Sequence, residues 1–143
     1  MRVFLDTNVI FSGLYSPHGA PNRLLEAANK ETIEIVVSQD VLRELTRNMR
    51  DKAPHVLARL NEFLVGTALD VVPNPPDVEI LRWRQAGLES DAAIAAAVAL
   101  SDADYFCTGD KRLISRLRGE SLAALIVTPA ELDRLLSETV ATD

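Results

Sequence analysis

The stretch Arg2-Val3-Phe4-Leu5-Asp6-Thr7-Asn8 runs three large apolar residues directly into a carboxylate. Such a run is typical of a short strand buried on both faces, as in a parallel sheet covered by helices. Asp6 then falls at the carboxyl end of the strand, the edge of an open α/β sheet where ligands bind. Asp and Asn also cap turns through their own backbone. This segment alone therefore leaves two interpretations of Asp6 and Asn8 open, a site and a turn.

The rest of the chain alternates β-branched runs with helical patterns, which predicts parallel strands joined by right-handed crossovers. Further strands are expected at Ile33–Val37, Ala68–Val72, Tyr105–Cys107 and Ala124–Val127. Helices are expected at Ala20–Asn29, Ser38–Asn48, Pro54–Val65, Val78–Gln85, Ala92–Leu100 and Lys111–Leu117, with a last one from a capping box at Thr128, Pro129 and Glu131 to about Leu136. The helix at Ala20–Asn29 is expected to follow a loop in which Ser16, Pro17, Gly19 and Pro21 break any earlier regularity. The fold class is therefore α/β, a three-layer α/β/α sandwich around a central parallel five-stranded sheet.

Length and composition favour one ordinary globular domain. We place it at residues 1–136 of the 143, with 137–143 as a frayed tail. No apolar run approaches the roughly 20 residues of a membrane span, and no cleavable leader opens the chain, so we expect a cytoplasmic protein with no membrane contact. The single cysteine, Cys107, excludes an internal disulfide, and with His18 and His55 it offers too few ligands for a zinc site.

The net charge of −6 argues against a nucleic-acid partner, but the basic residues are clustered. The segment from Arg43 to Arg59 has five basic residues against two acids, and the segment from Lys111 to Arg118 has four and none. Such clusters are typical either of solvated helix faces or of phosphate contacts.

Four acids fall where the predicted fold brings chain segments together. Asp6 and Asp110 follow strands, Asp91 opens the alanine-rich helix, and Glu44 lies beside the apolar stripe of the helix after the second strand. Each has an alternative role, since Asp91 and Asp110 also favour a helix N-terminus electrostatically and Glu44 fits a surface position. Carboxylates converging on one sheet edge repel one another unless a cation lies between them. Oxygen ligands of this kind suit Mg²⁺ or Mn²⁺.

Taken in order, these segments resemble the PIN-domain family. The motif Asp6-Thr7-Asn8-Val9-Ile10-Phe11-Ser12 is similar to the family's signature, and Glu44, Asp91 and the segment Tyr105–Lys111 with its Thr-Gly-Asp-Lys follow in the family's order. The resemblance covers nearly the whole chain. It implies a metal-dependent ribonuclease in which Asp6, Glu44, Asp91 and Asp110 bind the metal. It also implies the toxin of a toxin-antitoxin pair, hence an antitoxin partner, and, together with the apolar helices at Ala20–Asn29 and Pro54–Val65, a homodimer.

Other polar residues have secondary roles in this hypothesis. Asn8, Ser12 and Thr108 either orient the acids and touch phosphate or serve as turn and cap residues. Arg47 and Arg112 are candidates for RNA backbone contacts. Glu89 precedes the helix cap and is less well placed than Asp91, while Asp104 enters the fourth strand at the opposite sheet edge and is interpreted as structural.

Other classes of function remain to be weighed. A catalytically inert PIN scaffold that binds RNA or a protein would be expected to lose one of the four acids, and this chain keeps all four. A phosphotransferase of the haloacid dehalogenase type needs a second carboxylate at position 8, where Asn8 stands. A phosphoacceptor receiver domain needs an acid pair near the first strand, which is missing as well.

Overall fold

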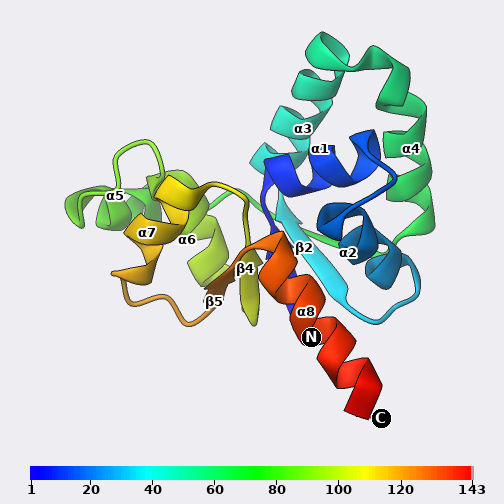
Figure 1. Ribbon diagram of the computed structural model, residues 1–143. Helices are drawn as coiled ribbons and strands as arrows, with labels where there is room; N and C mark the ends of the chain where they lie inside the picture. The colour runs from blue at the N-terminus through cyan, green and yellow to red at the C-terminus, as the bar shows by residue number, and fades with distance from the viewer. Residues whose placement is uncertain (143) are drawn as a thin grey trace.

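A computed structural model, which describes residues 1–142, shows a five-stranded sheet in which every pairing is parallel (Figure 1). The strand order is β3-β2-β1-β4-β5. The strands are β1 (Arg2–Leu5), β2 (Glu34–Ser38), β3 (Leu69–Val72), β4 (Tyr105–Cys107) and β5 (Leu125–Val127). All five predicted strands are confirmed to within one residue at each end.

The connections between strands are helical. The helices are α1 (Thr7–Tyr15), α2 (Ala20–Asn29), α3 (Gln39–Lys52), α4 (Leu57–Gly66), α5 (Asp77–Gln85), α6 (Ala92–Leu100), α7 (Lys111–Arg118) and α8 (Pro129–Thr142), with a 3₁₀ turn, η1 (Pro54–Val56), before α4. Figure 1 shows α1, α3 and α4 gathered on the side of β2, and α5, α6 and α7 on the side of β4 and β5. Among the residues described, no helix has the length and apolarity needed to cross a membrane.

Three parts of the predicted helix pattern are wrong. Helix α3 continues to Lys52, past its predicted end at about Asn48. Residues 7–15, for which no helix was predicted, form helix α1, since the Asp6 carboxylate caps its first turn and Val9, Ile10 and Leu14 bury one face. Helix α8 continues to Thr142 past the predicted end at Leu136. No glycine or proline follows Leu136 to stop that helix. The domain boundary at residue 136 stays a prediction.

The sheet is buried on both faces. Val3, Phe4 and Leu5 point to alternate sides of β1, and none of the three is exposed. Helices must therefore cover both faces of the sheet. Phe4 meets Phe106 of β4 edge to face, with ring centroids 5.7 Å apart. The three-layer α/β/α architecture expected from the sequence is therefore confirmed.

The strand order determines which edge of the sheet can hold a ligand. From β1 the chain moves outward to β2 and β3 and then returns to β4 on the other side of β1. The carboxyl ends of β1 and β4 therefore flank the point where the winding direction reverses, which is where open α/β sheets bind ligands. At the opposite edge, the Asp104 carboxylate accepts a hydrogen bond from the Arg2 backbone N–H at 2.8 Å, in keeping with a structural role.

Candidate active site

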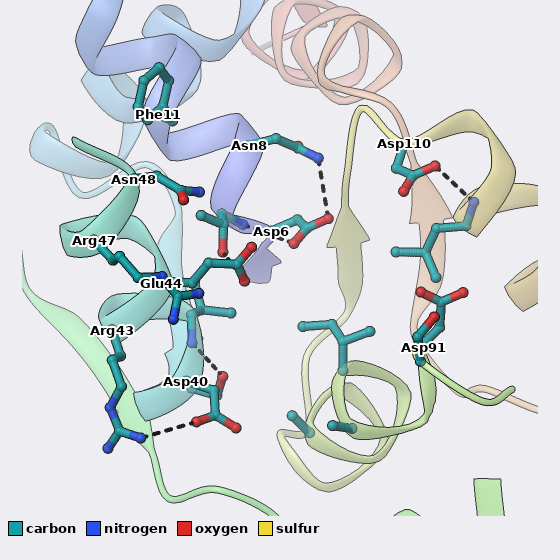
Figure 2. A pocket seen from close by; sticks show the side chains of 18 of the residues that line it. Asp6, Asn8, Phe11, Asp40, Arg43, Glu44, Arg47, Asn48, Asp91 and Asp110 are labelled. Atoms are coloured by element: carbon teal, nitrogen blue, oxygen red, sulfur yellow. Dashed lines mark hydrogen bonds and ion pairs between the residues drawn. The ribbon is translucent and has the colours of Figure 1, made fainter. Parts of the chain in front are cut away.

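A cavity of about 720 Å³ opens at the carboxyl ends of β1 and β4, and all four predicted acids line it. Asp6 follows β1, Glu44 projects from α3, Asp91 immediately precedes α6, and Asp110 immediately precedes α7. Figure 2 shows Asp6 and Glu44 on one side of this cavity and Asp91 and Asp110 on the other. The fold thus brings together carboxylates that are as far apart as 104 positions in the sequence.

Asp6 is held in place by hydrogen bonds. Its carboxylate accepts from the Thr7 backbone N–H at 2.9 Å, from the Thr108 hydroxyl at 2.7 Å and from the Asn8 amide at 3.4 Å. Burial raises the pKa of Asp6, and the negative charges of Glu44 and Asp110 raise it further, against the hydrogen bonds from Thr108 and Thr7. The ionised form is therefore electrostatically disfavoured, and a nearby cation would relieve it.

Hydrogen bonds from polar side chains connect the carboxyl ends of β1 and β4. The Thr108 hydroxyl, fully buried, also accepts from the Asp110 backbone N–H at 3.1 Å, and the Asn8 side-chain oxygen accepts from the Gly109 N–H at 3.3 Å. Asp110 in turn caps α7 by accepting from the Leu113 N–H at 3.1 Å. Asn8 and Thr108 thus contact both Asp6 and the loop before Asp110, which fits residues that orient the acids as well as turn and cap residues.

Helix α3 lines the cavity on the same side as Asp6, and its side chains there carry alternating charges. The exposed Glu44 accepts from the Thr7 hydroxyl at 3.4 Å, which connects α3 to the start of α1. Arg47 lines the cavity beside Glu44, as Figure 2 shows. Arg43 pairs with Asp40 at 3.8 Å. Ser12 also lines the cavity, one helical turn after Asn8 in α1.

Asp91 has an unusual environment. It occupies the N-cap position of α6, yet its side chain makes no capping hydrogen bond there. The side chain is only 13% exposed, and Oδ2 has no hydrogen-bond partner among the described residues. Two guanidinium groups of α7 form ion pairs with Oδ2, Arg112 at 3.7 Å and Arg116 at 3.8 Å. A buried carboxylate oxygen without a hydrogen bond is costly, and it is a potential ligand for a cation.

The carboxylate oxygens of the four acids are the kind of ligand that a hard divalent cation prefers. The acids are, however, too far apart in this structure to form a coordination shell. Within the described part of the chain, no three His, Cys, Asp or Glu side chains lie close enough to hold a metal ion as they stand. The donors are nonetheless all carboxylates around one cavity, and Asp91 Oδ2 has no hydrogen bond to give up. Binding an ion would require the acids to draw together, with Asp91 shifting away from its arginines.

Several residues that line the cavity were not predicted from the sequence. They are Phe11, Ser38, Asp40 and Asn48, together with Pro75, Ser90 and apolar residues of α3, α6 and α7, whereas Arg43 and Lys52 belong to the basic segment already noted in the sequence. Phe11 was missed because no helix was predicted at residues 7–15. The spacing of Asn8, Phe11 and Ser12 on one helical face was the signal that could have revealed it.

Comparison with known proteins agrees with this architecture. The sequence matches the PIN domain over residues 2–112. An uncharacterized protein of Methanocaldococcus jannaschii is 29% identical over 127 residues, which cover 85% of this chain and 77% of that protein.

Two solved structures share the fold. One is VapBC2 from Rickettsia felis bound to a DNA fragment from its promoter, with a TM-score of 0.67, 19% identity, and coverage of 90% of this chain and 98% of the matched one. The other is PAE2754 from Pyrobaculum aerophilum, with a TM-score of 0.63, 21% identity, and coverage of 96% and 90%. At these identities the similarity concerns the fold alone.

Proposed function

The chain belongs to the PIN-domain family, whose members are generally nucleases, and we propose that it is a metal-dependent ribonuclease that hydrolyses RNA phosphodiester bonds. The observation that carries this proposal is the cavity at the junction of β1 and β4, where acids from four separate elements gather. Helix capping accounts for Asp6 and Asp110, but not for Asp91, which makes no capping hydrogen bond, or for Glu44, which lies within α3. Burial and the neighbouring acids disfavour the ionised form of Asp6, and a cation in the cavity would offset this cost.

In this proposal Asp6, Glu44, Asp91 and Asp110 hold Mg²⁺ or Mn²⁺. The bound ion would supply an activated water and would stabilise negative charge on the phosphate and the leaving oxygen. Thr108 and Asn8 keep Asp6 and the loop before Asp110 in position through the hydrogen bonds described above. No protein nucleophile is required, in keeping with the absence of His and Cys from the residues that line the cavity.

Arg47 and Arg112 are the proposed contacts to the RNA backbone. Arg47 lines the cavity from α3, and Arg112 brings its guanidinium to within 3.7 Å of Asp91. Both therefore lie at the edge of the acid cluster, where an RNA phosphate must approach. Their positive charge would offset repulsion between the phosphate and the acids.

The direct test incubates single-stranded RNA with the protein in Mn²⁺ and, separately, in chelator. We expect cleavage only with the metal, and in Asp91→Asn a loss of more than about 100-fold. Glu89→Gln is the matched control, because Glu89 is an exposed acid two residues away that does not line the cavity. Equal cleavage in metal and in chelator would contradict the metal mechanism.

An inert PIN module that binds RNA or a protein is the second candidate. The ion pairs of Asp91 with Arg112 and Arg116 favour it, because those arginines occupy the place where a cation would otherwise balance the charge. RNA binding without cleavage under any metal condition would support this alternative.

We further propose that the protein acts in the cytoplasm, where its RNA substrate is found, as the toxin of a toxin-antitoxin pair and as a homodimer. The structural similarity to VapBC2 supports an antitoxin partner. A neighbouring reading frame for a small DNA-binding protein, whose product copurifies with this chain and blocks its cleavage of RNA, would be the expected partner. Copurification without any effect on cleavage would contradict the inhibitory role.

A further inference from the structure

We propose that Phe11, Tyr15 and His55 form a base-stacking track that carries single-stranded RNA away from the acid-lined cavity. The proposal rests on the proposed function and adds to it how the substrate is held beyond the acids. It assigns a role to Tyr15 and His55, which belong neither to the acid cluster nor to the core, and a second role to Phe11, which also packs against the core. We call these three side chains the aromatic track.

The track starts in the cavity and leads to the surface. Phe11 lines the cavity, and Figure 2 shows it on α1 at the end bordered by Asn48 of α3. One turn later on the same face of α1, Tyr15 stacks on Phe11, with ring centroids 6.0 Å apart and planes inclined by 13°. Tyr15 is 54% exposed, so the outer part of the track is open to a ligand.

The rings are held in place before any ligand arrives. His55 of η1 packs edge-on against Tyr15, with centroids 6.0 Å apart and an angle of 66° between the planes. Tyr15 therefore contacts two rings, Phe11 by stacking and His55 edge-on, while 54% of the residue remains exposed to solvent. A side chain ordered in advance loses little conformational entropy when a ligand binds. A base that stacks on Tyr15 would gain a flat apolar surface at low cost.

Cationic side chains accompany the track along its length. Arg47 and Lys52 of α3 line the cavity, and neither has an acid partner in the part of the chain that the structure describes. Further out, the exposed Arg59 of α4 donates a hydrogen bond to the carbonyl of Leu14, the residue before Tyr15, at 3.2 Å. None of these three cations has an acid partner among the described residues, so in a chain with a net charge of −6 they supply positive charge to a strand that leaves the cavity toward Tyr15.

The combination favours single-stranded nucleic acid as the occupant. Proteins that bind single strands without sequence preference pair a positively charged path for the backbone with aromatic rings on which bases stack. A duplex keeps its bases stacked inside the helix, so it has no free base face to place on Tyr15. The track is also continuous with the cavity through Phe11, so a strand whose phosphate lies near the acids can reach Tyr15.

The test measures the affinity of a fluorescent single-stranded RNA decamer by anisotropy, in chelator so that the strand stays intact. We expect Tyr15→Leu, which keeps an apolar side chain and removes the ring, to bind about five- to tenfold more weakly. Tyr15→Phe, which keeps the ring, should bind like the wild type. Leu125→Ala is the control for loss of an exposed apolar side chain, because Leu125 is 62% exposed and begins β5, at the far edge of the sheet from the cavity.

A second strand with abasic sites in place of its bases separates stacking from charge. The wild type should bind this strand more weakly than the intact one, and Tyr15→Leu should cause no further loss with it. The salt dependence of Tyr15→Leu should match the wild type, whereas Arg47→Ala should lower the slope by about 0.7. These readouts distinguish a stacking ring from one that merely supports the fold.

Two results would overturn the inference. If Tyr15→Leu binds the intact strand as tightly as the wild type, the track does not carry RNA, the proposed nuclease function stands on its own test, and a protein partner becomes the occupant to examine. If the wild type binds neither strand at any salt concentration, the RNA substrate itself is wrong, and this inference fails with it.

Discussion

At the scale of single residues, Asp91 has surroundings that its own helix does not explain. Its carboxylate is mostly buried, does not cap α6, and leaves Oδ2 without a hydrogen bond among the described residues. The two arginines that approach it are 63% and 37% exposed, and they sit beyond hydrogen-bonding distance. Such ion pairs contribute about 1 kcal/mol or less, comparable to the penalty for burying the charge.

We therefore expect Asp91→Asn to change the free energy of unfolding of the metal-free protein by less than about 1 kcal/mol. Wild type should gain about 2.7 kcal/mol when Mn²⁺ is present at 100 times its dissociation constant, and the variant should gain much less. Thermal melts of both proteins in chelator and in Mn²⁺ measure these differences. A strongly destabilised variant beside a wild type that ignores Mn²⁺ would make Asp91 a purely structural residue.

Gly13 matters because α1 and α2 approach closely there. A Cβ at this position would lie 2.6 Å from Leu25 Cδ1 and 3.0 Å from the Pro21 carbonyl oxygen. We expect Gly13→Ala to lose about 1 to 2 kcal/mol of stability, because overpacking costs about 1 to 3 kcal/mol and alanine's better helix propensity returns up to about 1. Denaturant unfolding measures the loss.

The matched control is Gly66→Ala at the end of α4, where the new Cβ would meet only Asn29 Oδ1 at 3.8 Å. That variant should be neutral or more stable by up to about 1 kcal/mol. Equal effects at the two glycines would mean that the approach of α1 to α2 is not tight.

The sequence was sufficient to find the four cavity acids. Asp6 directly follows an apolar strand, Asp110 lies three residues after another, and Asp91 opens an alanine-rich helix, while Glu44 lies beside the apolar stripe of the helix after the second strand. The ion pairs of Asp91 with Arg112 and Arg116 could not be predicted in the same way. They depend on how α7 packs beside the start of α6, and local sequence does not determine that geometry. Whether the acids bind metal stays a prediction.

At the scale of elements, the predicted capping box at the start of α8 is confirmed. The Thr128 N–H donates to the Glu131 carboxylate and the Glu131 N–H donates to the Thr128 hydroxyl, each at 3.1 Å. The hydrogen bonds from the backbone and side chain of Thr128 lower the pKa of Glu131, and the nearby charge of Arg118 lowers it further.

A lowered pKa in the folded state means that ionised Glu131 stabilises the fold above its ordinary value of 4.5. This contribution is lost as the pH falls through the folded-state pKa. We expect the free energy of unfolding of the wild type to exceed that of Glu131→Gln by about 0.3 to 1 kcal/mol near pH 7, because the negative charge of Glu131 is favourable at the N-terminus of a helix. The difference should close only as the pH falls below 4.5 and through the lowered folded-state pKa, where Glu131 becomes neutral like the glutamine. A gap that stays constant over this range, measured by thermal melts, would count against the charge.

Helix α1 shows where local signals compete. Ser16, Pro17, Gly19 and Pro21 suggested a loop, but they act only after Tyr15, where α1 ends. Val9, Ile10 and Leu14 are buried and spaced as on one face of a helix. The pattern is short, so from the sequence it can equally be taken as part of an apolar run. Packing against α2 and α3 decides in favour of a helix.

At the scale of the whole molecule, the apolar stripes of α2 and α4 are mostly used within the chain, and part of the α4 stripe, at Leu57 and Leu64, remains partly exposed for a homodimer contact. Leu24 and Leu25 of α2 and Leu60 and Phe63 of α4 are buried within the chain itself. The family resemblance remains its basis, so the homodimer stays a prediction. Light scattering at tens of micromolar should give twice the mass of one chain, and a single-chain mass would contradict it.

The four acids of the cavity come from two separate parts of the chain, one before β3 and one after it. Asp6 and Glu44 come from elements that precede β3, and Asp91 and Asp110 come from elements that follow it. Reading frames truncated after β3 should therefore be tolerated by cells that the full-length chain harms, which growth assays can measure. Under the proposed function, a chain still emerging from the ribosome cannot cut the message that encodes it until Asp110 has been made and β4 has docked beside β1. Under that function, the topology thus delays activity until the parts of the chain on both sides of β3 have been made.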